Sequence, residues 1–350
     1  MVGSHPLDGE TLETVLERIP RLRIGVIGDL FLDRYLDLDA ALTEPSLETG
    51  LDAYQVVRVR SNPGAAGTVI NNLIALGVGR IYPIAVLGDD GEGYELRQVL
   101  NRQPAVDSHG LIVASDHRTP TYTKPMLYEP GALPRELNRL DIKNRQPLSP
   151  MLEERIENKL AEIWPRVDAL VVLDQVSETD CGVITVGVRS RITELGAREP
   201  DKFILADSRQ RIGLFRGVCL KPNRDEALRA AGEPGSGGDN ALERAVAHLA
   251  RQAGRTVFCT DGGRGILIAS PQEGVQARIP AYPVRGPLDI VGAGDSTSAG
   301  IVCARACGAS QEAAASFGNL VASITIQQVG TTGTATPAQI RQRWSGERLA

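Results

Sequence analysis

Short runs of β-branched and aliphatic residues alternate along the chain with segments of helical periodicity, and this alternation restricts the fold more than any other feature. Such an order is typical of βαβ units, in which successive strands are parallel and the intervening helices cover the sheet. Strands are expected at residues 23–27, 81–87, 169–173, 203–206, 218–220, 256–259 and 265–269. The sequence therefore predicts an α/β fold with a mainly parallel sheet.

Helices are expected between these strands. A capping residue and a proline begin one of them at Ser149 and Pro150, and its apolar residues repeat at helical spacing as far as Ile163. Two further helices, rich in small residues, are expected in the last third of the chain at residues 296–306 and 311–329. The helical segments are thus long enough to serve as the crossovers of a parallel sheet.

Two segments interrupt this rhythm. Residues 35–60 follow the first strand, where a crossover helix would be expected, yet they read as extended, acidic and loop-rich. Residues 119–129 alternate like an exposed strand, with Pro120 and Pro125 marking its edges. We expect both segments to form a small accessory sheet that covers one side of the main domain.

The composition excludes several classes of protein. The chain has 38 Lys and Arg residues against 43 Asp and Glu residues, and this net charge of −5 argues against a nucleic-acid partner. No apolar run reaches the roughly 20 residues of a membrane helix, and residues 1–20 lack the apolar core of a signal peptide. The five cysteines are scattered without CxxC spacing and the four histidines do not cluster, which argues against structural zinc or disulfides and favours a reducing cytoplasm.

The most specific motif is Asp-Ile-Val-Gly-Ala-Gly-Asp at residues 289–295, directly before one of the expected helices. The turn of Gly292, Ala293 and Gly294 leaves backbone N–H groups free, and the helix dipole makes them an anion site. Asp295 alone would be read as a helix cap, but capping does not explain the glycines. An anion site beside a carboxylate is what phosphoryl transfer to a hydroxyl needs, because the amides neutralise the transferring group while the carboxylate accepts the alcohol proton.

Further motifs, in the same order along residues 22–338, resemble those of the ribokinase/PfkB family of sugar and nucleoside kinases. They are GDLFLDRY at 28–35, PGAAGT at 63–68, GDDGEG at 88–93, the N-x-x-E element at 223–226 and Val-Gly-Thr at 329–331. Within that family, GDLFLDRY together with PTYTKPML at 120–127 and LNRLD at 137–141 is most similar to the kinase domain of heptose-phosphate kinases. The resemblance thus covers most of the chain.

The resemblance implies a ribokinase-like three-layer α/β/α sandwich with a small β-sheet lid. A kinase domain at residues 22–338 would lie between an N-terminal extension at 1–21 and a C-terminal tail at 339–350. The lid would come from segments at about 37–60 and 119–127, and a homodimer formed through the lid is an expectation of the same resemblance. The site is expected at the carboxyl ends of the strands, where open α/β sheets bind their ligands.

The resemblance also implies a function: transfer of the γ-phosphoryl group of ATP to a hydroxyl of a sugar or sugar phosphate, with a heptose phosphate as one candidate acceptor. Asp295 would be the base, and Gly292, Ala293 and Gly294 would form the anion hole. The substrate-binding residues that it implies are Asp33, Gly64, Ala65, Thr68, Lys124, Arg139 and Asp174. The nucleotide-binding residues that it implies are Asn223, Glu226, Thr260, Gly262, Gly265 and Gly330. ATP and Mg²⁺ are the implied cofactors, joined by a monovalent cation such as K⁺, and the metal would be held by Asn223 and, through water, by Glu226.

The departures from the family pattern lie on the acceptor side. Ala65 and Thr68 stand where the family usually has a second glycine and an asparagine, and residues 171–176 replace a stretch that normally contains a lysine. These changes put the identity of the acceptor in question. Residues 207–209 follow another strand, where polar side chains often line such a site, and both a structural and a functional interpretation stay open for them.

Other functions stay open as well. A dinucleotide-binding oxidoreductase would need G-x-G-x-x-G directly after a strand, and residues 25–28 lack that spacing. A nucleoside kinase or another small-alcohol kinase of the same family is the main alternative. A non-catalytic relative that senses a sugar or nucleotide is a further one, although the intact Asp295 argues against it.

Overall fold

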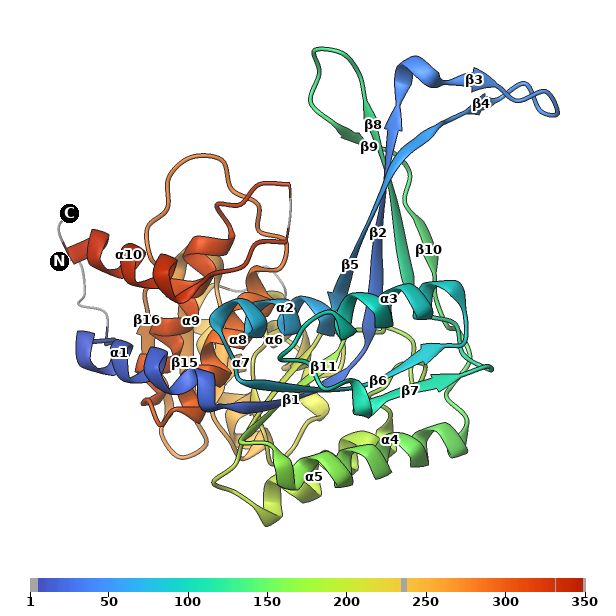
Figure 1. Ribbon diagram of the computed structural model, residues 1–350. Helices are drawn as coiled ribbons and strands as arrows, with labels where there is room; N and C mark the ends of the chain where they lie inside the picture. Colours follow the sequence, from blue (N-terminus) through green and yellow to red (C-terminus); the bar gives the residue numbers. More distant parts are fainter. Residues whose placement is uncertain (1–5, 234–237, 331, 349–350) are drawn as a thin grey trace.

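The computed structural model describes residues 6–233, 238–330 and 332–348. Its centre is a nine-stranded sheet with the strand order β16-β15-β14-β13-β12-β11-β1-β6-β7 (Figure 1). The strands are β1 (Arg23–Gly28), β6 (Arg80–Gly88), β7 (Leu111–Ala114), β11 (Ala169–Asp174), β12 (Phe203–Ser208), β13 (Cys219–Leu220), β14 (Val257–Thr260), β15 (Ile266–Ser270) and β16 (Gly274–Ile279). Neighbouring strands from β7 to β14 are parallel, whereas β15 and β16 continue the sheet in antiparallel fashion. The predicted α/β class and mainly parallel sheet are confirmed.

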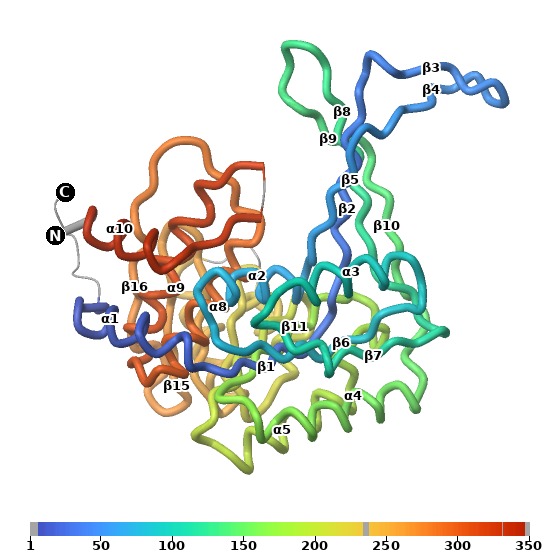
Figure 2. Tube along the Cα trace, viewed as in Figure 1, coloured from blue at the N-terminus to red at the C-terminus, as the bar shows by residue number. Residues whose placement is uncertain are grey.

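Helices cover both faces of this sheet (Figures 1 and 2). One layer contains α1 (Gly9–Arg18), α2 (Ala66–Leu76), α3 (Gly91–Asn101), α8 (Ala293–Ala306), α9 (Gln311–Thr325) and α10 (Pro337–Arg348), and the other contains α4 (Pro150–Ile163), α5 (Val186–Arg198), α6 (Arg224–Ala230) and α7 (Asp239–Ala253). Adjacent residues of one strand face different layers, as Val171 and Val172 of β11 do. Strands buried on both faces read as continuous apolar runs, which is why the sequence predicts them well.

A second sheet stands away from the body of the molecule and is called the lid here (Figures 1 and 2). Its strands are β2 (Leu30–Asp39), β5 (Val56–Ala65), β8 (Thr121–Tyr128), β9 (Arg135–Glu136) and β10 (Leu140–Ile142), and β3 (Glu44–Pro45) and β4 (Asp52–Ala53) form its tip. Strand β2 is antiparallel to β5 and parallel to β8. The lid therefore consists of two parts, Leu30 to Ala65 and Thr121 to Ile142, which extend beyond the segments expected at about 37–60 and 119–127.

The acidic residues of β2 explain why the sequence indicates a loop there. Asp37 is 6% exposed, and its Oδ1 lies 2.8 Å from Arg60 Nη2 of the neighbouring strand β5. Opposite charges across an antiparallel ladder stabilise it by about 0.2–1 kcal/mol per pair, whereas an acidic stretch considered alone disfavours a strand. The partner Arg60 lies 23 residues away on another strand, so the residues next to Asp37 in sequence do not reveal the pair.

The start of the lid is fixed to the body by Asp29, which is 3% exposed. Its carboxylate accepts hydrogen bonds from the backbone N–H groups of Gln175, Val176 and Val183 at 2.7–2.9 Å. Burial, and next the carboxylate of Asp174, raises the pKa of Asp29 to about 6, although these three hydrogen bonds oppose the rise. Asp29 thus joins the end of β1 to the loop that follows β11, and both border the crevice at the carboxyl ends of the strands.

Helix α8 is held against α9 by a contact between two glycines. A Cβ atom on Gly300 would lie 2.8 Å from the Cα atom of Gly318, a separation that real side chains do not adopt. The absence of both side chains lets the two helix backbones approach closely, at the usual cost of glycine to helix stability, about 0.5–1 kcal/mol each. This contact determines the position of α8, whose first turn carries the Gly-Ala-Gly motif.

Candidate active site

The first turn of α8 has the geometry of an anion hole. Gly292 precedes the helix with a φ of 80°, and a Cβ atom there would lie 2.6 Å from Thr332 Cγ2 and 3.3 Å from Thr68 Cγ2, so glycine is required. No side chain of the described residues caps this helix end. The N–H of Ala293 donates to the carbonyl oxygen of Ile290 at 3.1 Å, so Ala293 does not offer the free N–H that the sequence predicts. The N–H groups of Gly294 and Asp295 stay available to an anion. The identity of that anion stays a prediction.

Asp295 follows this turn directly, and its side chain is half-buried. Burial is the main reason that the pKa of its carboxyl is raised to about 7. The carboxylate of Asp207 adds to the rise, whereas Lys221 and Arg209 oppose it. A carboxylate with a pKa near neutral pH accepts a proton more readily than an ordinary aspartate does. Asp295 thus has the position and the basicity of a general base.

Lys221 is a residue of this site that the sequence interpretation missed. Its ammonium lies 2.8 Å from Asp207 Oδ2, and the lysine side chain is 3% exposed. The same nitrogen would lie 3.5 Å from a Cβ atom on Gly294, so it borders the anion hole. A lysine directly after a buried strand is the signal that could have revealed it, because a buried ammonium must be paired or have a function.

Asn223 and Glu226 form a capping box at the start of α6. Asn223 Oδ1 accepts from the N–H of Glu226 at 2.9 Å, and Glu226 Oε2 accepts from the N–H of Asn223 at 2.8 Å. Burial, and next the carboxylate of Asp207, raises the pKa of Glu226. The Glu226 carboxyl therefore has a structural role, because one of its oxygens completes the capping box. Its charge also interacts with Asp207 and Lys221, and its role in binding a metal stays a prediction.

Three predicted nucleotide residues lie in the turn between β14 and β15. Thr260 Oγ1 donates to the carbonyl oxygen of Pro222 at 3.5 Å, which places this turn beside the start of α6. Gly265 has a φ of 89°, and a Cβ atom there would lie 1.9 Å from the carbonyl oxygen of Ile279. The backbone of this turn therefore requires glycine at position 265, whether or not a nucleotide binds. Gly262 is exposed, and a Cβ atom on it would meet no atom within 4 Å. Their contacts to a nucleotide stay predictions.

Gly330 belongs to the loop after α9. Its N–H donates to Asp289 Oδ2 at 3.0 Å, and Asp289 Oδ1 accepts from the N–H of Val291 at 3.0 Å. Asp289 thus joins the loop after α9 to the loop before α8, and the two loops approach the anion hole together. Thr331, part of the expected Val-Gly-Thr motif, lies outside the described residues.

On the acceptor side, the structure brings Asp33, Gly64 and Lys124 together at the base of the lid. A Cβ atom on Gly64 would lie 2.8 Å from Asp33 Oδ2, so the absence of a side chain makes room for this carboxylate. Lys124 Nζ lies 3.6 Å from the same oxygen. Burial raises the pKa of Asp33, and the charges of Lys124, Arg139 and Arg209 oppose the rise. The arrangement presents a carboxylate and an ammonium to the crevice beneath the lid.

Thr68 and Ala65 lie at the start of α2. Thr68 is 6% exposed, and its methyl group faces Gly292, so the residue borders the anion hole as well as the acceptor side. Ala65 precedes the helix with a φ of 52°, a conformation that glycine adopts more easily. The alanine therefore keeps the backbone conformation of the glycine that the family usually has there, at the cost of some strain.

The structure does not support the predicted role of Asp174. This carboxylate is 1% exposed, with Oδ1 2.5 Å from Arg211 Nη2 and Oδ2 2.6 Å from Ser208 Oγ. Its oxygens are therefore used within the protein, and a sugar cannot reach them.

The guanidinium of Arg139 is held by two contacts within the protein. Its Nε lies 2.6 Å from Asp141 Oδ1, and the guanidinium stacks 4.1 Å from the ring centre of Tyr122. Arg139 can therefore contribute its charge to the acceptor side without being free to move.

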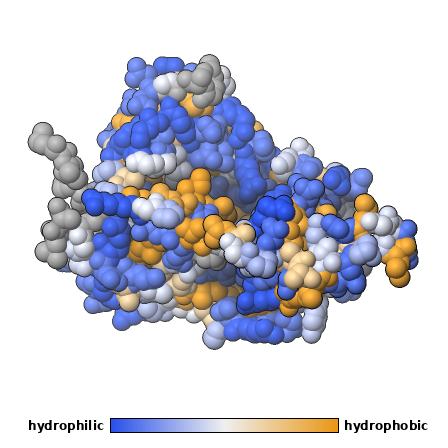
Figure 3. Space-filling view, turned by 90° about the horizontal axis from the view of Figure 1, so that it is seen from above, coloured by the Kyte–Doolittle hydropathy of each residue, from blue (hydrophilic) through white to orange (hydrophobic). Residues whose placement is uncertain are grey.

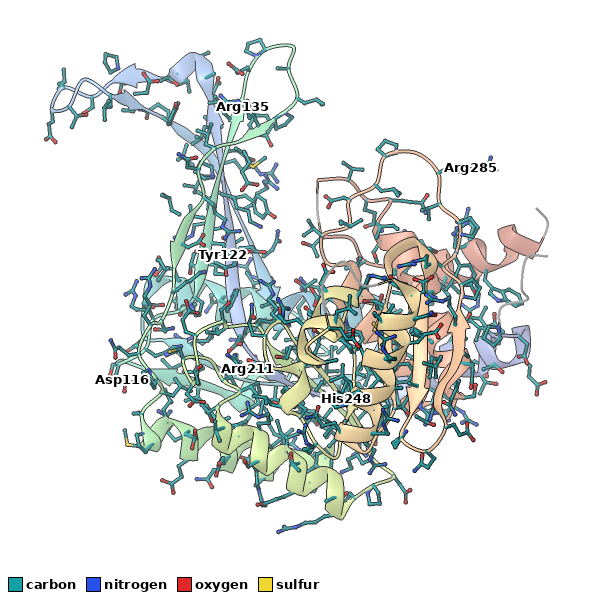
Figure 4. The ribbon with its side chains drawn as sticks, turned by 180° about the vertical axis from the view of Figure 1, so that it is seen from behind. Asp116, Tyr122, Arg135, Arg211, His248 and Arg285 are labelled. Carbon is teal, nitrogen blue, oxygen red and sulfur yellow. The ribbon has the colours of Figure 1, made fainter. Side chains whose placement is uncertain are left out.

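Arg209 belongs to the stretch at residues 207–209, for which the sequence left a structural and a functional role open. Its Nε donates to Gln175 Oε1 at 2.7 Å, and its positive charge lowers the pKa of both Asp33 and Asp295 against the effect of burial. It also lines a cavity of about 60 Å³ together with Tyr122 and Lys143. Figure 4 shows Tyr122 on the lower part of the lid above this region of the body. Arg209 therefore acts electrostatically on the carboxylates of both the acceptor side and the anion hole.

Comparison with known proteins identifies a family model. Residues 218–339 match the pfkB family carbohydrate kinase model. The bifunctional protein HldE of Trichlorobacter lovleyi is 30% identical over 343 residues, which cover 95% of this chain and 65% of that protein. The bifunctional protein HldE of a Caulobacter species is 31% identical over 328 residues, with 91% and 63% covered. The chain thus spans about 65% of the length of the first of these curated relatives.

Solved structures show the same fold. A structure of Arabidopsis thaliana ribokinase complexed with ribose and ATP matches with a TM-score of 0.66 at 16% identity, covering 92% of this chain and 98% of the other. Phosphofructokinase-2 from Escherichia coli in complex with potassium matches with a TM-score of 0.69 at 16% identity, covering 93% and 99%. The expected ribokinase-like fold is therefore confirmed. Among the described residues, no helix has the length and apolar character to cross a membrane.

Proposed function

Because residues 218–339 match the pfkB family carbohydrate kinase model and the chain is 30% identical to a bifunctional protein HldE, we propose that it is a kinase of this family. It would transfer the γ-phosphoryl group of ATP to a hydroxyl of a sugar or sugar phosphate. The observation that carries the proposal is the uncapped start of α8, which places free N–H groups and the Lys221 ammonium beside Asp295. Phosphoryl transfer needs little covalent chemistry from the protein, so positioning and charge stabilisation account for most of the catalysis.

In the proposed reaction, the acceptor hydroxyl gives its proton to the carboxylate of Asp295. The acceptor oxygen then forms a bond to the γ-phosphorus, and the bond from that phosphorus to the bridging oxygen breaks to release ADP. The N–H groups of Gly294 and Asp295, together with Lys221, stabilise the negative charge on the transferring group. The lid lies over the acceptor side, where its closure would exclude water and so suppress ATP hydrolysis.

The residues near α6 fit the predicted Mg²⁺. Glu226 and Asp207 bring two carboxylates close to one lysine, and only one oxygen of Glu226 is used in the capping box. When bound, Mg²⁺ would neutralise the nucleotide phosphates and keep most of its waters, so that Glu226 and Asn223 would hold it indirectly. For a monovalent cation, the support is the potassium complex of the phosphofructokinase-2 neighbour.

For the acceptor, we favour a sugar phosphate related to heptose phosphate. Lys124 lies 3.6 Å from Asp33, and the cavity lined by Arg209 and Lys143 adds two further cations to this side of the crevice. Asp33 suits a sugar hydroxyl, whereas arginine and lysine suit a phosphate. Arg209 acts electrostatically on Asp33, and this proximity of a carboxylate and a cation supports an acceptor that carries both a hydroxyl and a phosphate. Asp174 is no longer part of this proposal.

The proposal is tested by a phosphorylation screen with Mg·ATP over pentoses, hexoses, heptose phosphates and nucleosides, with ADP release as the readout. We expect ADP release that depends on a sugar or sugar-phosphate acceptor. A preference for nucleosides would support the alternative function within the same family. The absence of acceptor-dependent ADP release for every compound would favour a non-catalytic relative.

The pH dependence of the reaction follows from Asp295. A base must be ionised to act, so kcat/KM for the acceptor should fall about tenfold per pH unit below the pKa of about 7 and level off above it. An ordinary aspartate, with a pKa near 3.8, would give a flat profile over this range. Initial rates between pH 5.5 and 8.5, with the acceptor well below its KM, measure the profile. A kcat/KM that is constant between pH 5.5 and 7 would contradict the assignment.

Substitution of Thr68 by asparagine restores the amide that the family usually has at this position. We expect Thr68→Asn to change the ratio of kcat/KM between two acceptors by about tenfold. A buried amide favours an acceptor whose hydroxyl can hydrogen-bond to it over one that lacks this hydroxyl. The KM for ATP should stay within about twofold. Thr49→Asn makes the same chemical change at the exposed lid tip and should change neither value. A weaker ATP interaction with unchanged acceptor preference would place Thr68 outside the sugar pocket.

The lid also presents apolar side chains to solvent, which supports the expected homodimer. Val57 and Val59 of β5 are 55% and 53% exposed, and Leu47 and Leu51 at the tip are fully and mostly exposed. Figure 3 shows apolar side chains at the projecting end of the lid. Contiguous exposed apolar residues on a monomer are typical of an interaction surface. We propose that the lids of two copies pair through this surface.

The dimer is tested by sedimentation of the unmodified chain and of two matched variants. We expect a dimer for the wild type and for Val186→Asp, whose side chain is 53% exposed on α5, outside the lid. Val57→Asp should give a monomer, because burying an unpaired charge in an interface costs several kcal/mol. A wild-type monomer, or a Val57→Asp dimer of unchanged affinity, would exclude pairing through this face.

A further inference from the structure

A cavity of about 150 Å³ opens at the amino-terminal edge of β12, β13 and β14. Phe203, Cys219 and Phe258 give it an apolar lining, and Arg255 and Arg305 contribute two guanidinium groups. The active-site residues Asp207 and Lys221 lie at the other end of the same strands, as Phe203 and Cys219 each begin their strand. The cavity is therefore separate from the site described above.

The two guanidinium groups have unused hydrogen-bond donors. Arg255 Nη2 donates to the carbonyl oxygen of Gly196 at 3.2 Å, and Arg305 Nη1 donates to the carbonyl oxygen of Ala309. Each guanidinium carries five N–H donors, so most remain without an acceptor in the protein. The Nε atom of Arg305 is buried and has no hydrogen-bond partner among the described residues. A buried donor without an acceptor is unfavourable, and its positive charge adds to the excess of cations around the cavity.

The charges around the cavity also favour an anion. Within the described ranges, neither Arg255 nor Arg305 forms an ion pair with a carboxylate. The third cation of the lining, Lys202, is already engaged, because its ammonium lies 3.2 Å from Glu199 Oε2. Asp201 is the one acidic residue of the lining and is exposed. Two positive charges thus remain uncompensated around one enclosed space.

We propose that this cavity binds a phosphate group, as free inorganic phosphate or as the terminal phosphate of a small metabolite. Two guanidinium forks suit the oxygens of a phosphate, because each offers several N–H donors that the protein leaves unused. The volume suffices for such a group and some water, since one water occupies about 30 Å³ in the liquid. The half-buried aromatic ring of Phe203 would contact the carbon atoms of a monoester. The inference does not rest on the proposed kinase activity.

The test is calorimetric titration of the full chain with inorganic phosphate, in the presence of excess Mg²⁺ and a non-hydrolysable ATP analogue, whose γ-phosphate would occupy the start of α8 and keep inorganic phosphate from it. We expect Arg255→Gln and Arg305→Gln each to weaken phosphate binding by about tenfold or more, because each removes charge-assisted hydrogen bonds. Arg251→Gln removes an exposed arginine from α7, outside this cavity, and should bind as the wild type does. Arg255→Lys keeps the charge without the fork and provides a second variant should Arg255→Gln not fold.

A parallel titration with glycerol 3-phosphate distinguishes the two sources. Tighter binding of the monoester indicates a phosphorylated metabolite, and tighter binding of inorganic phosphate indicates the free ion. The proposal is overturned if the wild type binds neither compound, or if the arginine variants bind phosphate with wild-type affinity. Phosphate binding that is sensitive to Arg255 in a chain without ATP turnover would remove the proposed kinase function but leave this inference intact.

Discussion

Replacement of Asp295 by asparagine is expected to lower kcat by at least about 100-fold, the usual contribution of a general base. The carboxylate follows the N–H groups of the α8 turn directly, and burial together with Asp207 raises its pKa to about 7, so no other described group combines this position with this basicity. The amide has the same shape but cannot accept the hydroxyl proton. Steady-state rates with saturating acceptor and ATP measure the loss.

The same variant should still bind ATP, because the anion hole consists of backbone N–H groups that the substitution does not alter. Titration of the nucleotide into Asp295→Asn should therefore give a Kd within about threefold of the wild type. Asp116→Asn is the matched control, since Asp116 is an exposed carboxylate outside the proposed site and should keep full activity. A kcat near that of the wild type in Asp295→Asn would show that another group removes the proton.

Replacement of Lys221 by methionine is expected to have the second large effect, on both catalysis and stability. The ammonium borders the anion hole, so its loss should lower kcat by about 100-fold, as for a single oxyanion donor. It also leaves the buried carboxylate of Asp207 without its partner at 2.8 Å, which should destabilise the fold by about 3–5 kcal/mol. Denaturant unfolding and steady-state kinetics measure the two effects separately.

The double variant Lys221→Met with Asp207→Asn separates folding from catalysis. It removes both charges, so most of the stability should return while kcat stays low. In the single variant Lys221→Met, the acidic limb of the pH profile should move to higher pH, because Lys221 lowers the pKa of Asp295. A stable single variant with wild-type kcat and an unshifted profile would show that Lys221 has no part in the reaction.

The sequence predicts the main sheet and the α8 turn because both depend on local patterns. Strands such as β1 and β11 are apolar throughout, since helices cover both of their faces. In the motif at residues 289–295, the glycines of the turn and the carboxylate of Asp295 are close in sequence, so their geometry follows from the local sequence alone. The edge strands β7 and β16 were not expected, because the first is short and the second is half-exposed and contains polar residues.

The missed and mistaken residues depend on which strands are neighbours. Asp174 ends β11 at the expected edge, but the adjacent β12 supplies Ser208, and Arg211 follows it, so the carboxylate is bonded within the protein. Lys221 gains its role from Asp207, again on the neighbouring strand. Sequence spacing does not give the order of strands in a sheet. These pairs could therefore not be predicted from one sequence.

The contact between Gly300 and Gly318 has a consequence for inherited or engineered variation. Any larger residue at Gly300 would force α8 and α9 apart, since a Cβ atom there already meets the Gly318 backbone at 2.8 Å. Helix α8 is a single rigid rod, so a displacement at Gly300 would also move Asp295 relative to Lys221. A substitution in the middle of a buried helix, which touches no substrate, would thus resemble an active-site defect in a functional assay.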